Sequence, residues 1–245
     1  MRDCLIIIPT YNEKENIGKI IPFTLGLSDR FEILIIEDGS PDGTAAIVKD
    51  LMQQFPGRVH MVERASKNGL GTAYICGFKW ALERDYKYIF EMDADFSHDP
   101  KKLTELLDAC ENKGAYLAVG SRYVKEGGVV NWPWDRLFLS WFASKYVRLI
   151  TGMRIKDTTA GFVCYRRETL EHINFDRIKF VGYAFQVEMK LAVWMMELKV
   201  IEVPILFKDR EAGISKMSKG IIKEAVLGVL RMKWESLKNK QYYQK

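Results

Sequence analysis

Short apolar runs alternate with helical patterns over the first 120 residues, and this alternation limits the possible folds more than any other feature of the chain. The runs are rich in β-branched residues, and the segments between them carry apolar residues at i, i+3 and i+4 spacing. The strand-like runs span 4–8, 32–37, 58–63, 88–92 and 116–120, and the helical stretches span 13–25, 43–54, 69–83 and 101–113. The sequence therefore predicts right-handed βαβ units and an α/β fold with a doubly wound, mostly parallel sheet.

The alternation ends after Tyr123, but no composition shift accompanies the change. A Gly- and Trp-rich loop, KEGGVVNWPW, precedes helical patterns over 136–150 and 183–196, a strand-like run over 199–207 and a long helical pattern over 218–238. No linker-like, repetitive or low-complexity segment separates two halves. We therefore expect one domain over residues 1–245, with parts 1–122, 123–217 and 218–245, of which the last is an amphipathic C-terminal helix.

Composition excludes several classes of protein. With 48% hydrophobic residues in a chain of 245, a sizeable core can form, which argues against disorder. The net charge of +5 is uneven, because residues 208–245 hold ten Lys or Arg against four Asp or Glu, a balance of +6 that leaves −1 elsewhere. The four cysteines form no CxxC pair, which indicates reduced, buried thiols. Without a signal-like start or an apolar run of about 18 residues, we expect a cytoplasmic protein that does not span a membrane.

The most acidic of the polar clusters that follow the predicted strands is MDADFSHDP, at residues 92–100. Asp93 and Asp95 would point to opposite faces of a regular strand, so they can share an ion only where the strand becomes a loop. Neighbouring carboxylates repel each other unless a cation lies between them, and their hard oxygens suit Mg²⁺ or Mn²⁺. The alternative is a solvated acidic loop that caps a helix after Asp99. We expect His98, as a loop histidine, to face solvent rather than to bind the ion.

A second acidic cluster, EDGSPDG, follows the second predicted strand at residues 37–43. Asp42 and Gly43 are turn-forming residues, but a turn does not require Asp38. A carboxylate at this strand end could accept hydrogen bonds from a ribose or a base. No G-x-G-x-x-G follows the first strand and no G-x-x-x-x-G-K-[ST] occurs, which argues against hydride transfer and P-loop chemistry.

Nine motifs follow one another in an order that resembles a known family. They are IIIPTYNEKENI, EDGSPDGT, GLGTAYICGFKWA, MDADFSHDP, GSRY, NWPWDRLFLS, DTTAGFVCYRR, GYAFQVEM and VPILFKDREAGISKMS. Over about residues 4–220, this series resembles the polyprenol-phosphate mannose synthases (dolichol-phosphate mannosyltransferases) of glycosyltransferase family 2. An Asp-x-Asp alone is shared by many sugar-nucleotide enzymes, whereas the ordered series is specific.

The resemblance implies a Rossmann-like GT-A fold, with 1–122 as the nucleotide-sugar part and 123–217 as the acceptor part. It also implies GDP-mannose as donor, a polyprenyl phosphate as acceptor, and Mg²⁺ or Mn²⁺ as cofactor. Glu37 departs from the family, which often has Asp there. The implied nucleotide contacts are Pro9, Tyr11, Glu13, Ile36 and Asp38. The implied metal and phosphate contacts are Asp93, Asp95, the Ala94 backbone, Arg122, Arg136, Arg210 and Lys216, with Ser97 where some members place Gln as a third metal contact.

The implied reaction explains the basic residues. The diphosphate leaves as an anion, so the metal and the cationic side chains would stabilise charge that grows in the transition state. A phosphate acceptor, with a second pKa of about 6, is largely ionised and needs no strong general base. It does need a cation against anion repulsion, and Arg suits bidentate phosphate contact. We therefore expect Asp95, Arg122 and Arg136 to be catalytic and the displacement to give a β-linked product.

A lipid acceptor also requires contact with a membrane. Two helical patterns could provide it, and each carries basic residues beside an apolar face. The two apolar faces consist of Leu137, Phe138, Trp141 and Phe142, and of Ile222, Val226, Leu230, Trp234 and Leu237. The alternative for the second face is that it packs on the core of the domain.

Together these patterns predict an inverting transferase of mannose from GDP-mannose to polyprenyl phosphate, attached peripherally to the cytoplasmic membrane face. One alternative is transfer of another sugar, such as glucose from UDP-glucose, to the same lipid. Another is a module that binds sugar nucleotides or anionic lipids without turnover. No recognition module accompanies the basic tail, which argues against nucleic-acid binding, and nothing in the pattern points to a particular oligomeric state.

Overall fold

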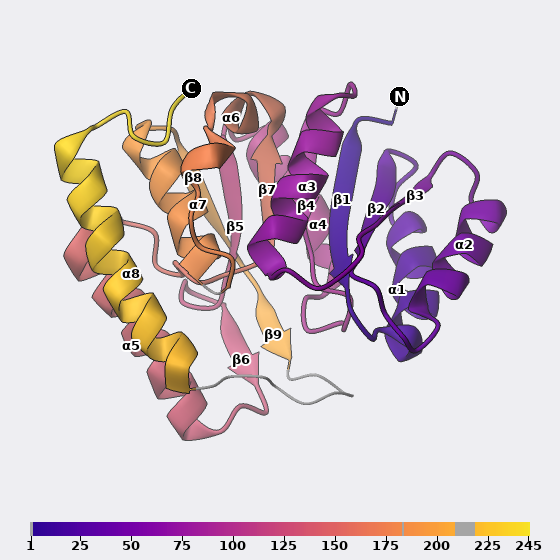
Figure 1. Cartoon of the computed structure of the whole chain (residues 1–245), viewed down its shortest axis with the longest axis horizontal. Coiled ribbons are helices and arrows are strands. Elements are labelled where there is room, and N and C mark those ends of the chain that lie inside the picture. Colours follow the sequence, from indigo (N-terminus) through magenta and orange to yellow (C-terminus); the bar gives the residue numbers. More distant parts are fainter. Residues whose placement is uncertain (1, 183, 209–218) are drawn as a thin grey trace.

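The structure, a computed structural model of the whole chain, describes residues 2–182, 184–208 and 219–245, the last range with side chains from Val226 onward. Within this part, seven strands form one sheet with helices on both faces (Figure 1). In sheet order the strands are β3 (Val59–Glu63), β2 (Phe31–Glu37), β1 (Cys4–Thr10), β4 (Tyr88–Glu91), β7 (Val163–Arg166), β5 (Leu117–Ser121) and β8 (Val200–Pro204).

All neighbouring strands of this sheet are parallel except at β7, which runs antiparallel to both β4 and β5. The predicted α/β class and mostly parallel sheet are thus confirmed. β7 arises from DTTAGFVCYRR, a segment for which the sequence predicts no strand. It is a buried strand of only four residues, too short to show a clear periodicity.

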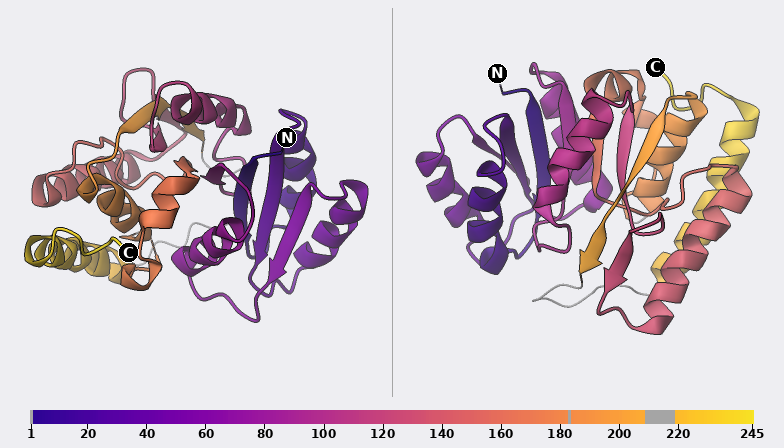
Figure 2. Two further views of the ribbon diagram at one scale, coloured as in Figure 1. Left: turned by 90° about the horizontal axis from the view of Figure 1, so that it is seen from above. Right: turned by 180° about the vertical axis from the view of Figure 1, so that it is seen from behind.

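Alternate residues of the central strands face opposite sides of the sheet, as the period of two requires. Leu5, Ile7, Leu34 and Ile36 join one hydrophobic core, and Cys4, Ile6, Ile8, Ile33 and Ile35 join the other. Helices α3 (Leu70–Leu82), α6 (Arg167–His172) and α7 (Ala184–Met195) contribute to the first core, and α1 (Lys14–Leu25), α2 (Thr44–Gln54) and α4 (Leu103–Glu111) contribute to the second. Figure 2 shows these helices on either side of the strands.

Two predicted elements begin or divide differently from the prediction. The helix predicted from residue 101 is preceded by a 3₁₀ turn, Pro100–Lys102, where Asp99 accepts a hydrogen bond from Lys101 N at 3.1 Å. The prediction of a single strand over 199–207 is wrong. Its second half, β9 (Leu206–Lys208), leaves the main sheet and pairs in parallel with β6 (Gly128–Val130). The strand divides after Pro204, which has no N–H to donate to a ladder.

Helices α5 (Trp134–Thr151) and α8 (Lys219–Lys238) lie side by side at the end of the molecule farthest from α1 and α2 (Figures 1 and 2). Val229 and Met232 of α8 are buried in the core. The described members of the predicted stripe face outward instead, since Val226, Leu230, Trp234 and Leu237 are all exposed. The alternative that this stripe packs on the core is therefore wrong for these residues, while the side chain of Ile222 lies outside the described ones.

Glu188 of α7 connects three segments of the chain. Its buried carboxylate accepts hydrogen bonds from Lys179 N at 2.8 Å, Phe180 N at 3.0 Å and the Tyr243 hydroxyl at 3.2 Å. Burial raises the pKa of Glu188 to about 7, and the two backbone N–H groups only partly oppose this effect. The interaction holds the C-terminal residues and the 179–180 loop against α7.

Glu188 should make the free energy of unfolding depend on pH. The folded state keeps the proton up to about pH 7, but the unfolded state releases it above about pH 4.5, so stability falls as pH rises through this window. Urea unfolding should show that the free energy of unfolding decreases between about pH 5 and about pH 8 by roughly 2–3 kcal/mol less in Glu188→Gln than in the wild type. Glu15→Gln, at an exposed position of α1, is the control, and equal pH profiles for all three proteins would contradict the assignment.

Candidate active site

The carboxyl ends of β1, β2, β4 and β5 lie at one edge of the sheet, and most predicted site residues follow them. β5 points the same way as β4 because both are antiparallel to β7 between them. The register places Pro9 opposite Ile36. The Ile36 side chain is fully buried in the core, so only its backbone could contact a ligand, whereas Pro9 is half-buried.

The loop after β1 is hydrogen-bonded to the loop after β2. Asn12 N donates to Ser40 Oγ at 3.1 Å, Glu13 N to Thr44 Oγ1 at 3.0 Å and Lys14 N to an Asp42 oxygen at 3.1 Å. Asp42 also accepts from Thr44 N and its hydroxyl, which confirms its predicted turn role. These bonds bring the predicted nucleotide contacts Tyr11 and Glu13 to the end of β2.

Asp38 is paired with a cation that the sequence analysis did not identify. Arg64, directly after β3, donates to both Asp38 oxygens, from Nε at 2.6 Å and Nη2 at 2.7 Å, and its Nη1 donates to Thr72 Oγ1 at 2.9 Å. Nearby, Glu37 accepts hydrogen bonds from Gly39 N and Ser40 N and so shapes the turn. The sequence signal for Arg64 is its position directly after the third predicted strand, because the other predicted site residues also follow strands.

The acidic segment after β4 is a loop, as a shared ion requires, because β4 ends at Glu91. Asp95 is buried and accepts hydrogen bonds from Ser97 N at 3.0 Å and Ser97 Oγ at 2.5 Å. The expectation that His98 faces solvent is wrong. Its ring is buried and stacked on Phe162 at 4.8 Å between centroids, and its Nδ1 accepts from Asp93 N at 3.2 Å.

These residues fit a divalent cation such as Mg²⁺ or Mn²⁺. Asp93 and Asp95 offer hard carboxylate oxygens, and the Asp93 side chain is 32% exposed at the surface of the loop. Such ions are commonly held by one or two carboxylates, with water and substrate phosphates completing the shell. Among the described residues, no three or more Asp, Glu, His or Cys side chains are grouped so that they could hold a metal ion on their own. Ser97 as a third ligand stays a prediction, and its hydroxyl here orients Asp95.

Arg122 follows β5 and forms a buried ion pair with Asp157. The Asp157 side chain is 0% exposed and that of Arg122 is 8% exposed. Arg122 donates from Nε and Nη2 to the two carboxylate oxygens, both at 2.7 Å, and from Nη2 to Thr159 Oγ1 at 2.9 Å. Burial alone would raise the pKa of Asp157, but the guanidinium outweighs it and holds that pKa below its usual value.

Aromatic rings bring the arginines and the acidic loop together. The Trp132 ring centroid lies 4.1 Å from the guanidinium carbon of Arg136 and 5.5 Å from that of Arg122. Phe207 lies against this group, 5.4 Å from the Trp132 ring, and also 5.4 Å from the ring of His98. These rings therefore bring the predicted site residues Arg122 and Arg136 into one group with the acidic loop, while Arg210 and Lys216 lie outside the described residues.

Three buried polar side chains beneath this edge of the sheet, Glu91, Gln186 and Lys190, were not predicted from the sequence. Gln186 of α7 donates a hydrogen bond to Glu91, and Lys190, one turn later, donates to Ala160 O at 2.5 Å. Burial raises the pKa of Glu91 to about 7 and lowers the pKa of Lys190 to about 8. Each charge limits the shift of the other. The sequence signal was a Gln and a Lys four apart within the otherwise apolar AFQVEMKLAVW.

Comparison with known proteins agrees with this arrangement. The family model described as glycosyl transferase family 2 matches residues 5–173. A polyprenol monophosphomannose synthase from Mycolicibacterium smegmatis is 48% identical over 225 residues, which cover 92% of this chain and 84% of that protein. An undecaprenyl-phosphate mannosyltransferase from Micrococcus luteus is 45% identical over 242 residues, which cover 96% of this chain and 97% of that protein.

Solved structures support the fold. A glucosyl-3-phosphoglycerate synthase from Mycobacterium tuberculosis, solved with Mn²⁺, uridine diphosphate and glucosyl-3-phosphoglycerate, aligns with a TM-score of 0.67 at 16% identity. The alignment covers 95% of this chain and 80% of that one. At this identity the likeness concerns the fold alone, and it confirms the predicted GT-A architecture. From the family match and the two close relatives, we conclude that the chain belongs to glycosyl transferase family 2.

Proposed function

We propose that this protein is an inverting glycosyltransferase that moves mannose from GDP-mannose to a polyprenyl phosphate and forms a β-linked product. Two relatives at 45–48% identity, matched over almost their whole length, carry the names of such transferases. The observation that carries the proposal is the position of Phe207, whose ring contacts the His98 ring of the acidic loop, the Arg122 guanidinium and the Trp132 ring. Trp132 in turn contacts Arg136. A donor diphosphate and an acceptor phosphate could meet there.

The donor side consists of the loops after β1 and β2 and the acidic loop. In this proposal Pro9, Tyr11, Glu13 and the backbone of Ile36 contact the nucleotide, with Asp38 at its guanine or ribose end. Asp93 and Asp95 would hold Mg²⁺ or Mn²⁺, which supplies positive charge against the diphosphate when bound. Ser97 orients Asp95, and His98 holds the backbone of Asp93. Ala94 contacts the donor through its backbone.

The acceptor side consists of the arginines around Trp132. The charge of Arg122 is balanced by Asp157, so its main contribution is a fixed guanidinium beside the aromatic cluster. Arg136 lies on the first turn of α5, at the edge of the exposed apolar surface, and in this proposal it contacts the acceptor phosphate. Arg210 and Lys216 remain predicted phosphate contacts.

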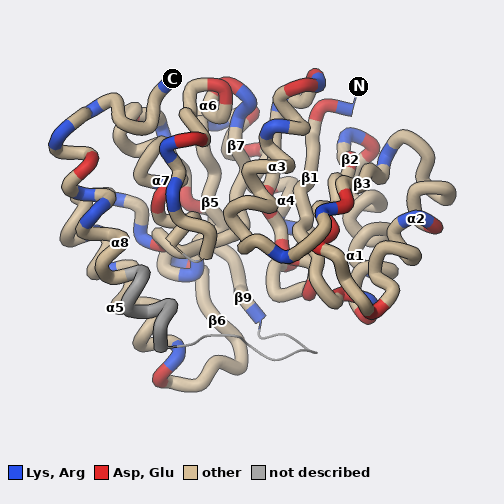
Figure 3. Tube along the Cα trace, viewed as in Figure 1, with Lys and Arg blue, Asp and Glu red and all other residues tan. Residues whose placement is uncertain are grey.

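We place the acceptor at a membrane surface, to which the protein would bind peripherally through α5 and α8. The exposed apolar side chains of these helices include Trp134, Phe138, Trp141, Phe142 and Leu149 on α5, and Val226, Leu227, Leu230, Trp234 and Leu237 on α8. Basic residues are interspersed along both helices (Figure 3). No helix in the described part of the chain is both long and apolar enough to cross a bilayer.

The metal assignment predicts that Asp93→Asn combined with Asp95→Asn lowers transfer by roughly 100-fold or more, because charge stabilisation of the leaving diphosphate is lost. The measurement is transfer of radiolabelled mannose from GDP-mannose to a prenyl phosphate, with Mg²⁺ or Mn²⁺ present. Asp99→Asn is the matched control in the same loop and should keep most activity. Failure of the wild-type protein to form a lipid-linked sugar from any GDP- or UDP-sugar would refute the enzyme assignment, and a preference for a UDP-sugar would refute the donor.

Asp157→Asn should destabilise the protein by about 3–5 kcal/mol, because it leaves the charge of Arg122 buried without its partner. Urea unfolding measures this change. Glu105→Gln breaks the exposed pair with Lys102 and should cost less than about 1 kcal/mol. Replacing both partners, with Arg122→Met and Asp157→Leu, should recover much of the stability but not the transfer activity. Full activity of this double variant would remove Arg122 from the site.

The exposed apolar surface predicts that Phe138→Ser combined with Leu230→Ser weakens binding to lipid vesicles by at least about tenfold, because each side chain contributes about 1.5–3 kcal/mol when buried in lipid. Co-sedimentation with vesicles measures the partition. Phe23→Ser removes an exposed ring from α1, at the other end of the molecule, and should leave vesicle binding unchanged. Equal losses in both variants would show that α5 and α8 are not the membrane surface.

A further inference from the structure

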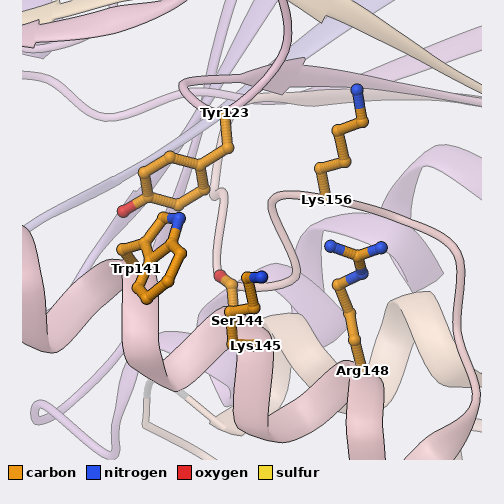
Figure 4. Close-up of a pocket in the computed structure, with 6 residues that line it drawn as sticks. All are labelled: Tyr123, Trp141, Ser144, Lys145, Arg148 and Lys156. Atoms are coloured by element: carbon orange, nitrogen blue, oxygen red, sulfur yellow. The ribbon is translucent and has the colours of Figure 1, made fainter.

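A small basic cavity lies between α5 and the segment that leads to Asp157. Its volume is about 60 Å³. Figure 4 shows Arg148 extending from α5 toward the segment that carries Lys156, with Ser144 and Lys145 on α5 between Trp141 and Arg148. The described residues that line it are Tyr123, Trp141, Ser144, Lys145, Arg148 and Lys156. Neither Arg122 nor Arg136 is among them. The Arg122 guanidinium carbon lies 5.3 Å from the Tyr123 ring, so the cavity adjoins the phosphate contacts assigned above without sharing their residues.

The charge of this basic cavity is not balanced by its described lining. Three of the lining side chains are cations and none is acidic. Within the described residues, no carboxylate lies within 4.0 Å of Lys145, Arg148 or Lys156 to form an ion pair. The carboxylate of Glu202 lies nearby, but it accepts hydrogen bonds from backbone groups, Lys156 N at 2.8 Å and Asp157 N at 3.0 Å.

Arg148 carries a second sign that the cavity is built for an anion. Its Nε is buried and has no hydrogen-bond partner among the described residues, although the side chain lines the cavity. A buried donor without an acceptor is costly, and three neighbouring cations repel one another. An oxyanion in the cavity would offset the repulsion among the three cations. The volume is several times the roughly 10–15 Å³ that one water needs, so a tetrahedral group with four oxygens fits.

The position of the cavity indicates where such an anion comes from. Trp141, which lines it, is exposed and belongs to the apolar surface of α5, as does Leu149, which is 83% exposed and follows Arg148 directly. The ammonium of Lys145 lies 4.8 Å from the Trp141 ring centroid. We propose that the basic cavity binds a phosphate group outside the transfer site, either the headgroup of an anionic phospholipid or a free phosphate.

Calorimetric titration of inorganic phosphate, with a metal chelator present, tests the cavity directly. Arg148→Gln combined with Lys156→Gln should weaken binding by about 25-fold, because each basic residue contributes about fivefold near an anionic group. Lys19→Gln combined with Lys87→Gln removes two exposed charges elsewhere and should change affinity less than twofold. Arg148→Lys keeps the charge and should keep most of the binding, and thermal unfolding checks that each variant is folded.

The background with Asp93→Asn and Asp95→Asn distinguishes this site from the transfer site. Phosphate binding should persist in that background even though transfer is lost, and its disappearance there would place the anion at the transfer site. If the Arg148 variants unfold, Lys156→Gln alone, at an exposed position, replaces them in the test. It should weaken phosphate binding by about fivefold.

Vesicles distinguish the two sources of phosphate. If the source is a lipid headgroup, the wild type should prefer equimolar phosphatidylcholine and phosphatidylglycerol over phosphatidylcholine alone, and the double variant should lose this preference. If only the titration with inorganic phosphate changes, the ligand is a free phosphate. Equal behaviour of the wild type and the double variant in both measurements would overturn the proposal.

Discussion

Four buried ionisable side chains lie beneath the carboxyl edge of the sheet, and their charged forms depend on one another because little water reaches them. Arg122 pairs with Asp157, and Lys190 lies within electrostatic reach of both Asp157 and Glu91. The four residues come from the ends of β4 and β5, from α7 and from the segment before β7. A shift of the segment before β7 away from the end of β5 would leave the charge of Arg122 or Asp157 unpaired, so this pair helps to fix the loops that carry the chemistry.

A carboxylate and a guanidinium are also paired on the predicted nucleotide side of the site. Asp38 accepts hydrogen bonds from Nε and Nη2 of Arg64, and Nη1 of the same guanidinium donates to Thr72. The acidic loop is shaped by the buried His98 ring rather than by solvent. A rigid frame of this kind suits a reaction in which positive charge must be in place before a diphosphate leaves. The apolar surface of α5 and α8 lies beside this frame, where a lipid-borne acceptor could approach.

The sequence predicted the positions of the site residues better than their partners. Asp38, Asp93, Asp95 and Arg122 could be placed because each follows a strand, and parallel strands end at one edge. Their partners come from distant segments: Arg64 lies 26 residues from Asp38, and Asp157 lies 35 residues from Arg122. Local periodicity carries no information about such pairs, because they form only when separate loops are brought together by packing.

The sequence alone determined the α/β alternation, the strand ends that carry polar residues and the existence of two amphipathic helices, because backbone geometry repeats over a few residues and leaves a readable pattern. Only the tertiary structure decided that β7 inserts antiparallel between β4 and β5, that the strand after residue 199 divides between two sheets, and that Leu230 and Trp234 face outward while Val229 and Met232 face the core. These outcomes depend on which surfaces meet after the chain has closed its long loops, and burial between distant segments, rather than local preference, selects among them.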